Sequence, residues 1–207
     1  MADILLDQEG VPNAPASNTG LLYFDNISKL LTTRTSVIPT TVGPIRNFST
    51  GAQAYTTTEV YVTGSALTVP SHLLQAGTRC HWRIVASKTA GTGTPAWKLY
   101  KGTLGTTGDT NIATLTQVSV PTSVTDTAIY DIEAIVRNTG ASGVMLFSLY
   151  MTHVLQNTGF SLLPANVQQV ASSSFDTTAA SLIIGVSVNY GTAGAGNIEQ
   201  VYSEFLG

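Results

Sequence analysis

The sequence predicts an all-β protein, an antiparallel jelly-roll-like sandwich with an extended N-terminal arm. Its 207 residues include 31 Thr and 18 Ser beside 19 Gly and 8 Pro, and only 10% are charged, against about 25% in ordinary domains. From residue 56 onward, apolar and polar residues alternate with period two, in runs of about 8–12 residues that end in turn formers. Long connections between these runs favour jelly-roll or Greek-key wiring over a meander.

Residues 1–55 are expected to form an extended arm and a linker. Residues 1–20 combine a short apolar patch with two prolines and a small polar tail, which is typical of an extended segment. Residues 21–34 could form a small hairpin, which would need a neighbour because an isolated two-stranded hairpin is marginal in water. Residues 36–54 contain Pro and Gly with few paired apolar positions and are interpreted as a linker.

Residues 56–207 form the predicted sandwich. The expected strands are residues 56–63, 65–69, 78–88, 96–101, 111–120, 127–137, 143–155, 167–173, 181–190 and 197–206. In two of these strands apolar and polar residues alternate most clearly, and solvent or a partner can contact the side chains that point outward. These outward residues are Arg79, His81, Arg83, Val85 and Ser87 in one strand and Asp131, Glu133 and Arg137 in the other.

Residues 143–155 are apolar on both faces, which predicts a central strand that is covered on both sides. The glycine-rich stretches 91–93 and 191–196 neither open a helix nor carry the lysine of a phosphate-binding loop. We therefore expect them to be hairpin loops.

Charge and hydropathy weigh against several classes of partner. The net charge is −3 and the nine Lys and Arg residues form no basic run, so a nucleic-acid partner is not expected. Neither an apolar run of about 18–20 residues nor a signal-peptide pattern occurs. We therefore expect no membrane partner, and we expect the newly made chain to be located in a cytoplasm. The single cysteine, Cys80, excludes an intrachain disulfide.

The sequence predicts no enzyme, metal site or cofactor. There is no G-x-S-x-G motif, and the neighbours Cys80 and His81 should point to opposite faces of a strand. The three histidines lack metal-ligand spacing. Asp131 and Glu133 share a face and could act as acid and base on a glycoside, although an exposed strand face explains them equally well.

Aromatic residues leave a binding role open. Trp97 lies beside the Pro95 turn, and we expect it to be exposed; with Tyr100 it could contact a glycan. The alternative is that these rings fill the core. An apolar, uncharged sheet face would also fit burial between identical subunits.

Several segments resemble virion proteins of tailed bacteriophages. Gly20-Leu21-Leu22-Tyr23-Phe24-Asp25 followed by Lys29-Leu30-Leu31 resembles the short N-terminal tags of such proteins. Residues 74–94, 127–142 and 153–160 are similar to the β-rich heads of phage fibre and head-decoration proteins. The resemblance is one of pattern and covers about half of the chain.

The resemblance implies a homotrimeric virion surface protein that is assembled in the host cytoplasm. We expect a capsid decoration or cement protein bound to the major capsid protein or another virion protein, because the chain lacks the repetitive shaft of a fibre. The expected docking residues are Ile4, Leu5, Leu6, Leu22, Tyr23 and Phe24. The resemblance thus implies that residues 1–55 dock on the virion and that residues 56–207 trimerise. The alternatives are a flexible terminus with a small satellite cluster at the docking residues and, for the whole chain, a tail fibre or receptor-binding tip that recognises host polysaccharide.

Overall fold

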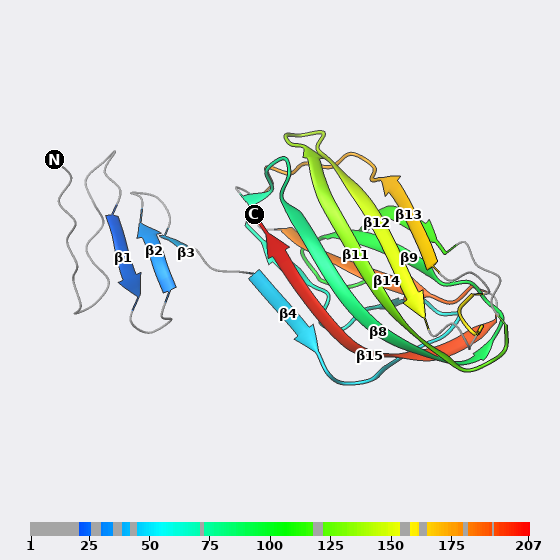
Figure 1. The fold of residues 1–207 in the computed structure, drawn as a ribbon. Helices are drawn as coiled ribbons and strands as arrows, with labels where there is room; N and C mark the ends of the chain where they lie inside the picture. Colours follow the sequence, from blue (N-terminus) through cyan, green and yellow to red (C-terminus); the bar gives the residue numbers. More distant parts are fainter. Residues whose placement is uncertain are drawn as a thin grey trace. The chain divides into compact units, whose positions relative to one another are not determined.

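The computed structural model describes residues 21–25, 30–34, 39–41, 45–70, 73–117, 122–153, 158–161, 165–179, 182–191 and 193–207. The chain divides into two compact units, Met1–Pro44 and Ile45–Gly207. The described residues contain fifteen strands and no α-helix, which confirms the all-β class (Figure 1).

The first unit contains a three-stranded antiparallel sheet in the order β1-β2-β3. Its strands are β1 (Leu21–Asp25), β2 (Leu30–Arg34) and β3 (Pro39–Thr41). Leu21 pairs with Arg34, so the hairpin expected over residues 21–34 is confirmed. The extended arm expected over residues 1–20 lies outside the described residues.

The second unit consists of two antiparallel sheets. The larger sheet has the order β13-β12-β11-β8-β15-β4, and β5 pairs with β15 as well. Its strands are β4 (Ile45–Ser49), β5 (Gln53–Tyr55), β8 (Arg79–Gly91), β11 (Asp126–Asn138), β12 (Val144–His153), β13 (Ala165–Ala171) and β15 (Gly194–Leu206). The smaller sheet has the order β10-β9-β14-β6, and β7 also pairs with β14. Its strands are β6 (Val60–Tyr61), β7 (Leu67–Val69), β9 (Ala96–Gly102), β10 (Thr110–Thr116) and β14 (Leu182–Asn189).

The strand pairing is that of a jelly roll. In this fold a long antiparallel hairpin rolls up, so that strands pair in nested order and are shared between two sheets. Here β4 pairs with β15, β7 with β14, β8 with β11, and β9 with β10. β12 and β13 follow β11 in the chain and extend the larger sheet beyond the nested pairs.

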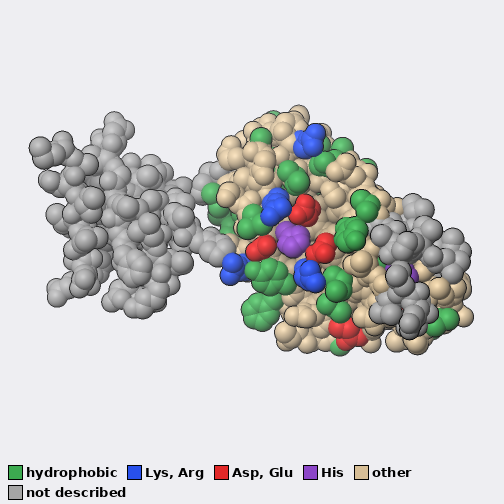
Figure 2. Space-filling model, viewed as in Figure 1, with side chains coloured by type: hydrophobic (Ala, Val, Ile, Leu, Met, Phe, Trp, Pro, Cys, Tyr) green, Lys and Arg blue, Asp and Glu red, His purple; other side chains and the backbone are tan. Residues whose placement is uncertain are grey.

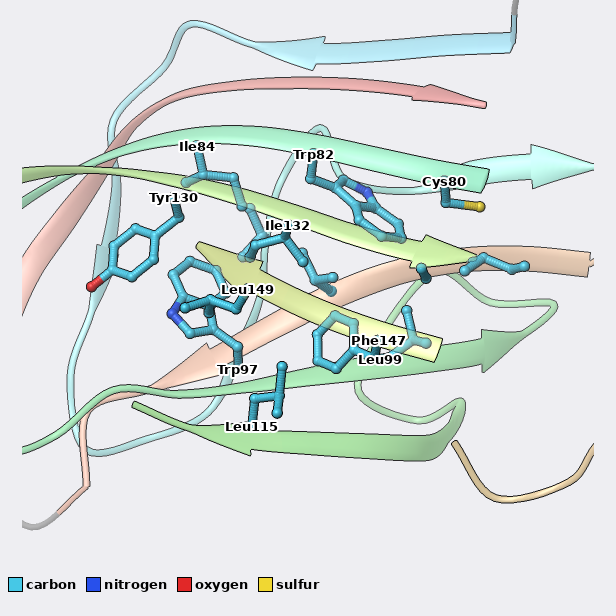
Figure 3. Packing of buried hydrophobic residues seen from close by; sticks show 14 of the residues in the cluster. Cys80, Trp82, Ile84, Trp97, Leu99, Leu115, Tyr130, Ile132, Phe147 and Leu149 are labelled. Atoms are coloured by element: carbon cyan, nitrogen blue, oxygen red, sulfur yellow. The ribbon is translucent and has the colours of Figure 1, made fainter. Parts of the chain in front are cut away.

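The core lies between the two sheets, where alternate side chains of both sheets meet. Trp82 and Tyr130 come from the larger sheet and Trp97 and Leu115 from the smaller one (Figure 3). The rings of Trp97 and Tyr130 have their centroids 4.8 Å apart and so join the sheets directly. Such large buried rings account for much of the apolar area removed from water.

Part of the expected linker belongs to the sandwich. β4 lies within residues 36–54 and β5 begins there, and both pair with the edge of β15, with Ser49 opposite Val201 and Tyr55 opposite Gly196. These short segments are held by a strand about 150 residues later in the chain, so local sequence gives little sign of them.

The two glycine-rich stretches are not hairpin loops. Residues 91–95 lead from β8 in the larger sheet to β9 in the smaller sheet, and residues 190–193 lead from β14 back to β15. These two connections, at which the chain crosses from one sheet to the other, are in contact, because the Gly93 amide donates a hydrogen bond to the Ala193 carbonyl. Gly91 has φ +85°, and a Cβ there would lie 2.6 Å from the Ala193 carbonyl oxygen. Glycine is therefore required at this crossing.

Candidate functional site

The outward side of the larger sheet carries a group of charged side chains. We call it the outer face; Figure 2 shows a histidine in its middle with acidic and basic groups around it. Arg79, His81 and Arg83 project from β8, and Asp131 and Glu133 project from β11. The expected outward alternation of these two strands is confirmed by their burial pattern.

Strand register brings these charges into a network. His81 lies between two carboxylates, with Nε2 3.5 Å from Asp131 and Nδ1 3.5 Å from Glu204 of β15. Arg83 lies 3.7 Å from Asp131, and Arg79 lies 3.2 Å from Glu133. The members are partly exposed, so each single pair contributes little to stability. The network instead gives the outer face a fixed pattern of charge.

Exposed apolar side chains lie on both sides of this network. On one side Phe48 of β4 is 70% exposed and Tyr202 of β15 is 36% exposed. On the other side Tyr150 of β12 is 42% exposed and Val167 of β13 is 72% exposed. The register joins them in one row across the sheet: Phe48, Tyr202, Arg83, Asp131, Tyr150 and Val167.

The sequence analysis did not identify four members of this face: Arg46, Phe48, Val167 and Glu204. Arg46 lies 4.0 Å from Glu204 and so extends the network to β4. The period-two pattern of residues 197–206 does place Tyr202 and Glu204 on one face, which is the signal that could have found Glu204.

A second polar cluster lies on the outward side of the smaller sheet, around Glu59. Its carboxylate accepts hydrogen bonds from the Tyr100 hydroxyl at 2.6 Å, the Ser187 hydroxyl at 2.5 Å and the Lys98 ammonium group. Burial by itself would raise the pKa of Glu59, but the hydrogen bonds from Lys98, Ser187 and Tyr100 outweigh it and hold this pKa below its usual value.

The structure separates the two aromatic residues considered for glycan contact. The expectation that Trp97 is exposed is wrong: it is 1% exposed and packs on Tyr130 in the core, because β9 turns this side chain toward the larger sheet. Tyr100 lies on the outward side of the smaller sheet but is 6% exposed, and Glu59 holds its hydroxyl.

The expected docking residues lie in the first unit. Leu22, Tyr23 and Phe24 belong to β1, where they pair with Thr33, Thr32 and Leu31 of β2. Ile4, Leu5 and Leu6 lie outside the described residues. Their role in docking stays a prediction.

The residues considered for catalysis are placed as their strands require. Cys80 is fully buried and points into the core, where burial raises the pKa of its thiol, while His81 points outward. Asp131 and Glu133 lie on the outer face, each beside a basic group.

Among the described residues, no group of three or more His, Cys, Asp or Glu side chains could hold a metal ion. No helix in the described part is long and apolar enough to cross a membrane.

A buried polar cluster closes one end of the sandwich. Lys88, which is 1% exposed, donates to the carbonyl oxygens of Thr122 and Gly159. Asp126, opposite Lys88 in the register, accepts the Phe160 amide at 3.0 Å and lies 3.1 Å from Nδ1 of His153. Burial lowers the pKa of Lys88, and the charge of Asp126 partly offsets this. These bonds tie the connecting segments to the strands.

Comparisons with known proteins add one structural likeness. No protein-family profile and no curated protein matches the chain. Among solved structures, a chain from the structure of infectious bursal disease virus Gx strain matches with a TM-score of 0.25 and 11% identity. The match covers 95% of this chain and 46% of that one, so this chain spans less than half the length of the viral chain.

Proposed function

We propose that this chain is a non-enzymatic structural protein of a bacteriophage virion, which binds the particle surface as a decoration or cement protein. The observation that carries the proposal is the division into two units of different construction. Residues 45–207 form a jelly roll with its own core, whereas the described strands of the first 44 residues form a separate small sheet. The resemblance of residues 20–31 to virion attachment tags gives this first unit the docking role.

The mechanism is thermodynamic. A protein that binds only the assembled particle stabilises it by mass action. An oligomer carries several copies of the first unit. Once one copy has bound the particle, the next binds at a high effective concentration, which raises the overall affinity. The partner is the major capsid protein or another virion protein, and the resemblance implies three copies in the oligomer.

Removal of residues 1–44 tests the docking role. The full chain and the truncated chain are each mixed with phage heads prepared without this protein, and the particles are sedimented. We expect the full chain to pellet with the heads and the truncated chain to remain in the supernatant with an unchanged β-sheet circular dichroism spectrum. Equal pelleting of both chains contradicts the proposal.

Substitution within the intact chain provides a finer test. Tyr23→Ala and Phe24→Ala together should weaken binding to the heads about tenfold or more if these side chains are docking anchors. Labelled protein located on particles by electron microscopy then separates attachment to the head from attachment to the tail.

The alternative is a tail fibre or receptor-binding tip for host polysaccharide. Trp97 cannot contact a glycan in this structure, because its ring is buried. Tyr100 retains only a small exposed area. A glycan array probed with the intact chain measures whether this activity exists.

A further inference from the structure

The outer face of the larger sheet is broad enough for a stable protein interface. Six strands across at about 4.8 Å spacing and a mean strand length of about 33 Å give a face of roughly 900 Å², close to the ~800 Å² per partner of a standard interface. Four of its side chains are exposed hydrophobics, Phe48, Tyr150, Val167 and Tyr202. Exposed aromatic rings in one row of a sheet are typical anchors of a binding surface.

At the centre of this face the charges are sorted by strand. The outward positions of β8 carry the basic groups Arg79, His81 and Arg83, and the neighbouring positions of β11 carry the acidic groups Asp131 and Glu133. Further charged residues lie outside these two groups, among them Arg137 at the end of β11, Glu204 on β15 and Arg46 on β4. The line between β8 and β11 therefore separates a basic stripe from an acidic stripe. It also divides the sheet evenly, with β15 and β4 beyond β8 and with β12 and β13 beyond β11.

This arrangement is complementary to itself. A two-fold axis along the line between β8 and β11 would lay β8 of one copy on β11 of another, β15 on β12, and β4 on β13. Arg83 would then face Asp131 of the partner subunit, and His81 would face the partner's Glu133. The same operation brings Tyr202 over the partner's Tyr150 and Phe48 over the partner's Val167, because each pair lies in one row of the register.

We propose that the outer face is an isologous interface that binds a second copy of this chain, face to face. Two sheets stacked in this way lie about 10 Å apart with their strands aligned, within the range of about 30° that packed sheets show. The apolar pairs at the margins supply affinity, and the opposed stripes fix the register and reject other alignments. The inference rests on the outer face alone and not on attachment to a virion.

The decisive test exchanges charge between copies. Arg83→Asp gives a face with acids at both 83 and 131, and Asp131→Arg gives a face with bases at both positions. Each variant alone should repel its own copy and raise the dissociation constant about tenfold or more. An equimolar mixture of the two full-length variants should associate again, because every acid then faces a base.

Native mass spectrometry of the intact chain provides the readout. The wild type should give two chains per particle, or six where the three-fold assembly implied by the resemblance also forms. The mixture should give particles that contain both variants in equal number. A wild-type mass of one or three chains, or a mixture that stays as dissociated as its components, overturns the proposal.

Two further variants control for unspecific effects of a new charge. Val167→Asp places a carboxylate at the apolar margin of the outer face and should dissociate the particle. Leu104→Asp changes a similarly exposed hydrophobic residue in the 103–109 connection of the smaller sheet and should leave the mass unchanged. Equal dissociation by both variants contradicts the proposed interface. Retained phage-head binding by the dissociated variants would leave the proposed function standing.

Discussion

Tyr190→Phe should stabilise the protein, because it removes a buried hydroxyl that has no hydrogen-bond partner among the described groups. The ring itself is well packed: its centroid lies 5.3 Å from that of Tyr55 and 6.3 Å from that of Phe160, and the Lys88 ammonium group lies 5.7 Å from it. Phenylalanine keeps these contacts. A buried unpaired polar group costs about 1–3 kcal/mol, so after allowance for the small void we expect a gain of about 1 kcal/mol near neutral pH.

The same substitution should change the alkaline stability profile. Burial, with the charge of Asp126, raises the pKa of Tyr190 above its usual value of about 10. Above that pH the unfolded chain loses the phenolic proton while the folded chain keeps it, so stability falls as pH rises. One such group contributes a slope of about −1.4 kcal/mol per pH unit, which the phenylalanine variant lacks. The advantage of Tyr190→Phe should therefore grow by about this amount per unit above pH ~10.

Tyr130→Phe is the matched control. Its hydroxyl is also buried but donates to the Gln117 side-chain oxygen at 2.9 Å, so its loss leaves that oxygen unpaired and should cost about 1–3 kcal/mol near neutral pH. Urea unfolding followed by tryptophan fluorescence, at fixed protein concentration, measures both variants across the pH range. A Tyr190→Phe protein less stable than wild type near pH 7, or one with an unchanged alkaline slope, would refute the reasoning.

Three other substitutions test the packing of the core, the close approach of two strands and the polar cluster around Glu59. Trp97→Ala should cost about 3–5 kcal/mol in urea unfolding, as expected for a core ring and not for a surface contact. Gly196→Ala should destabilise the protein by about 2 kcal/mol or more, because the new Cβ meets the Ser87 carbonyl oxygen, whereas Gly51→Ala, with open space around it, serves as the neutral control. Glu59→Gln should flatten the acid side of the stability profile: the depressed pKa of Glu59 contributes stability above its usual value of 4.5, and this is lost as pH falls through the folded-state pKa.

The elements with strong alternation were predictable from the sequence. β8 and β11 lie within a few residues of their expected bounds, and Arg79, His81 and Glu133 point outward as expected. Side-chain direction in a strand repeats every two residues, so it depends on local sequence alone. Segments held by distant strands were missed, as the expected linker shows: β4 and β5 exist because β15 offers an edge to pair with.

The outer face was likewise predictable only in part. The sequence determined which side chains are outward on each strand, but not which strands lie side by side. That Arg83 meets Asp131, and that Phe48 and Val167 end the same row, follows from the order and register of the strands across the whole larger sheet. The burial of Trp97 likewise required the larger sheet to cover β9.

By itself, the sequence determined the all-β class, the turn-rich surface and the inward and outward side of the regular strands, because composition and period-two alternation act over a few residues. Only the tertiary structure decided which strands are neighbours in each sheet, where the chain crosses between the sheets, and that the basic residues of β8 lie beside the acidic residues of β11. These features depend on contacts between strands far apart in the chain, whose stability comes from burying a shared core that no single segment contains.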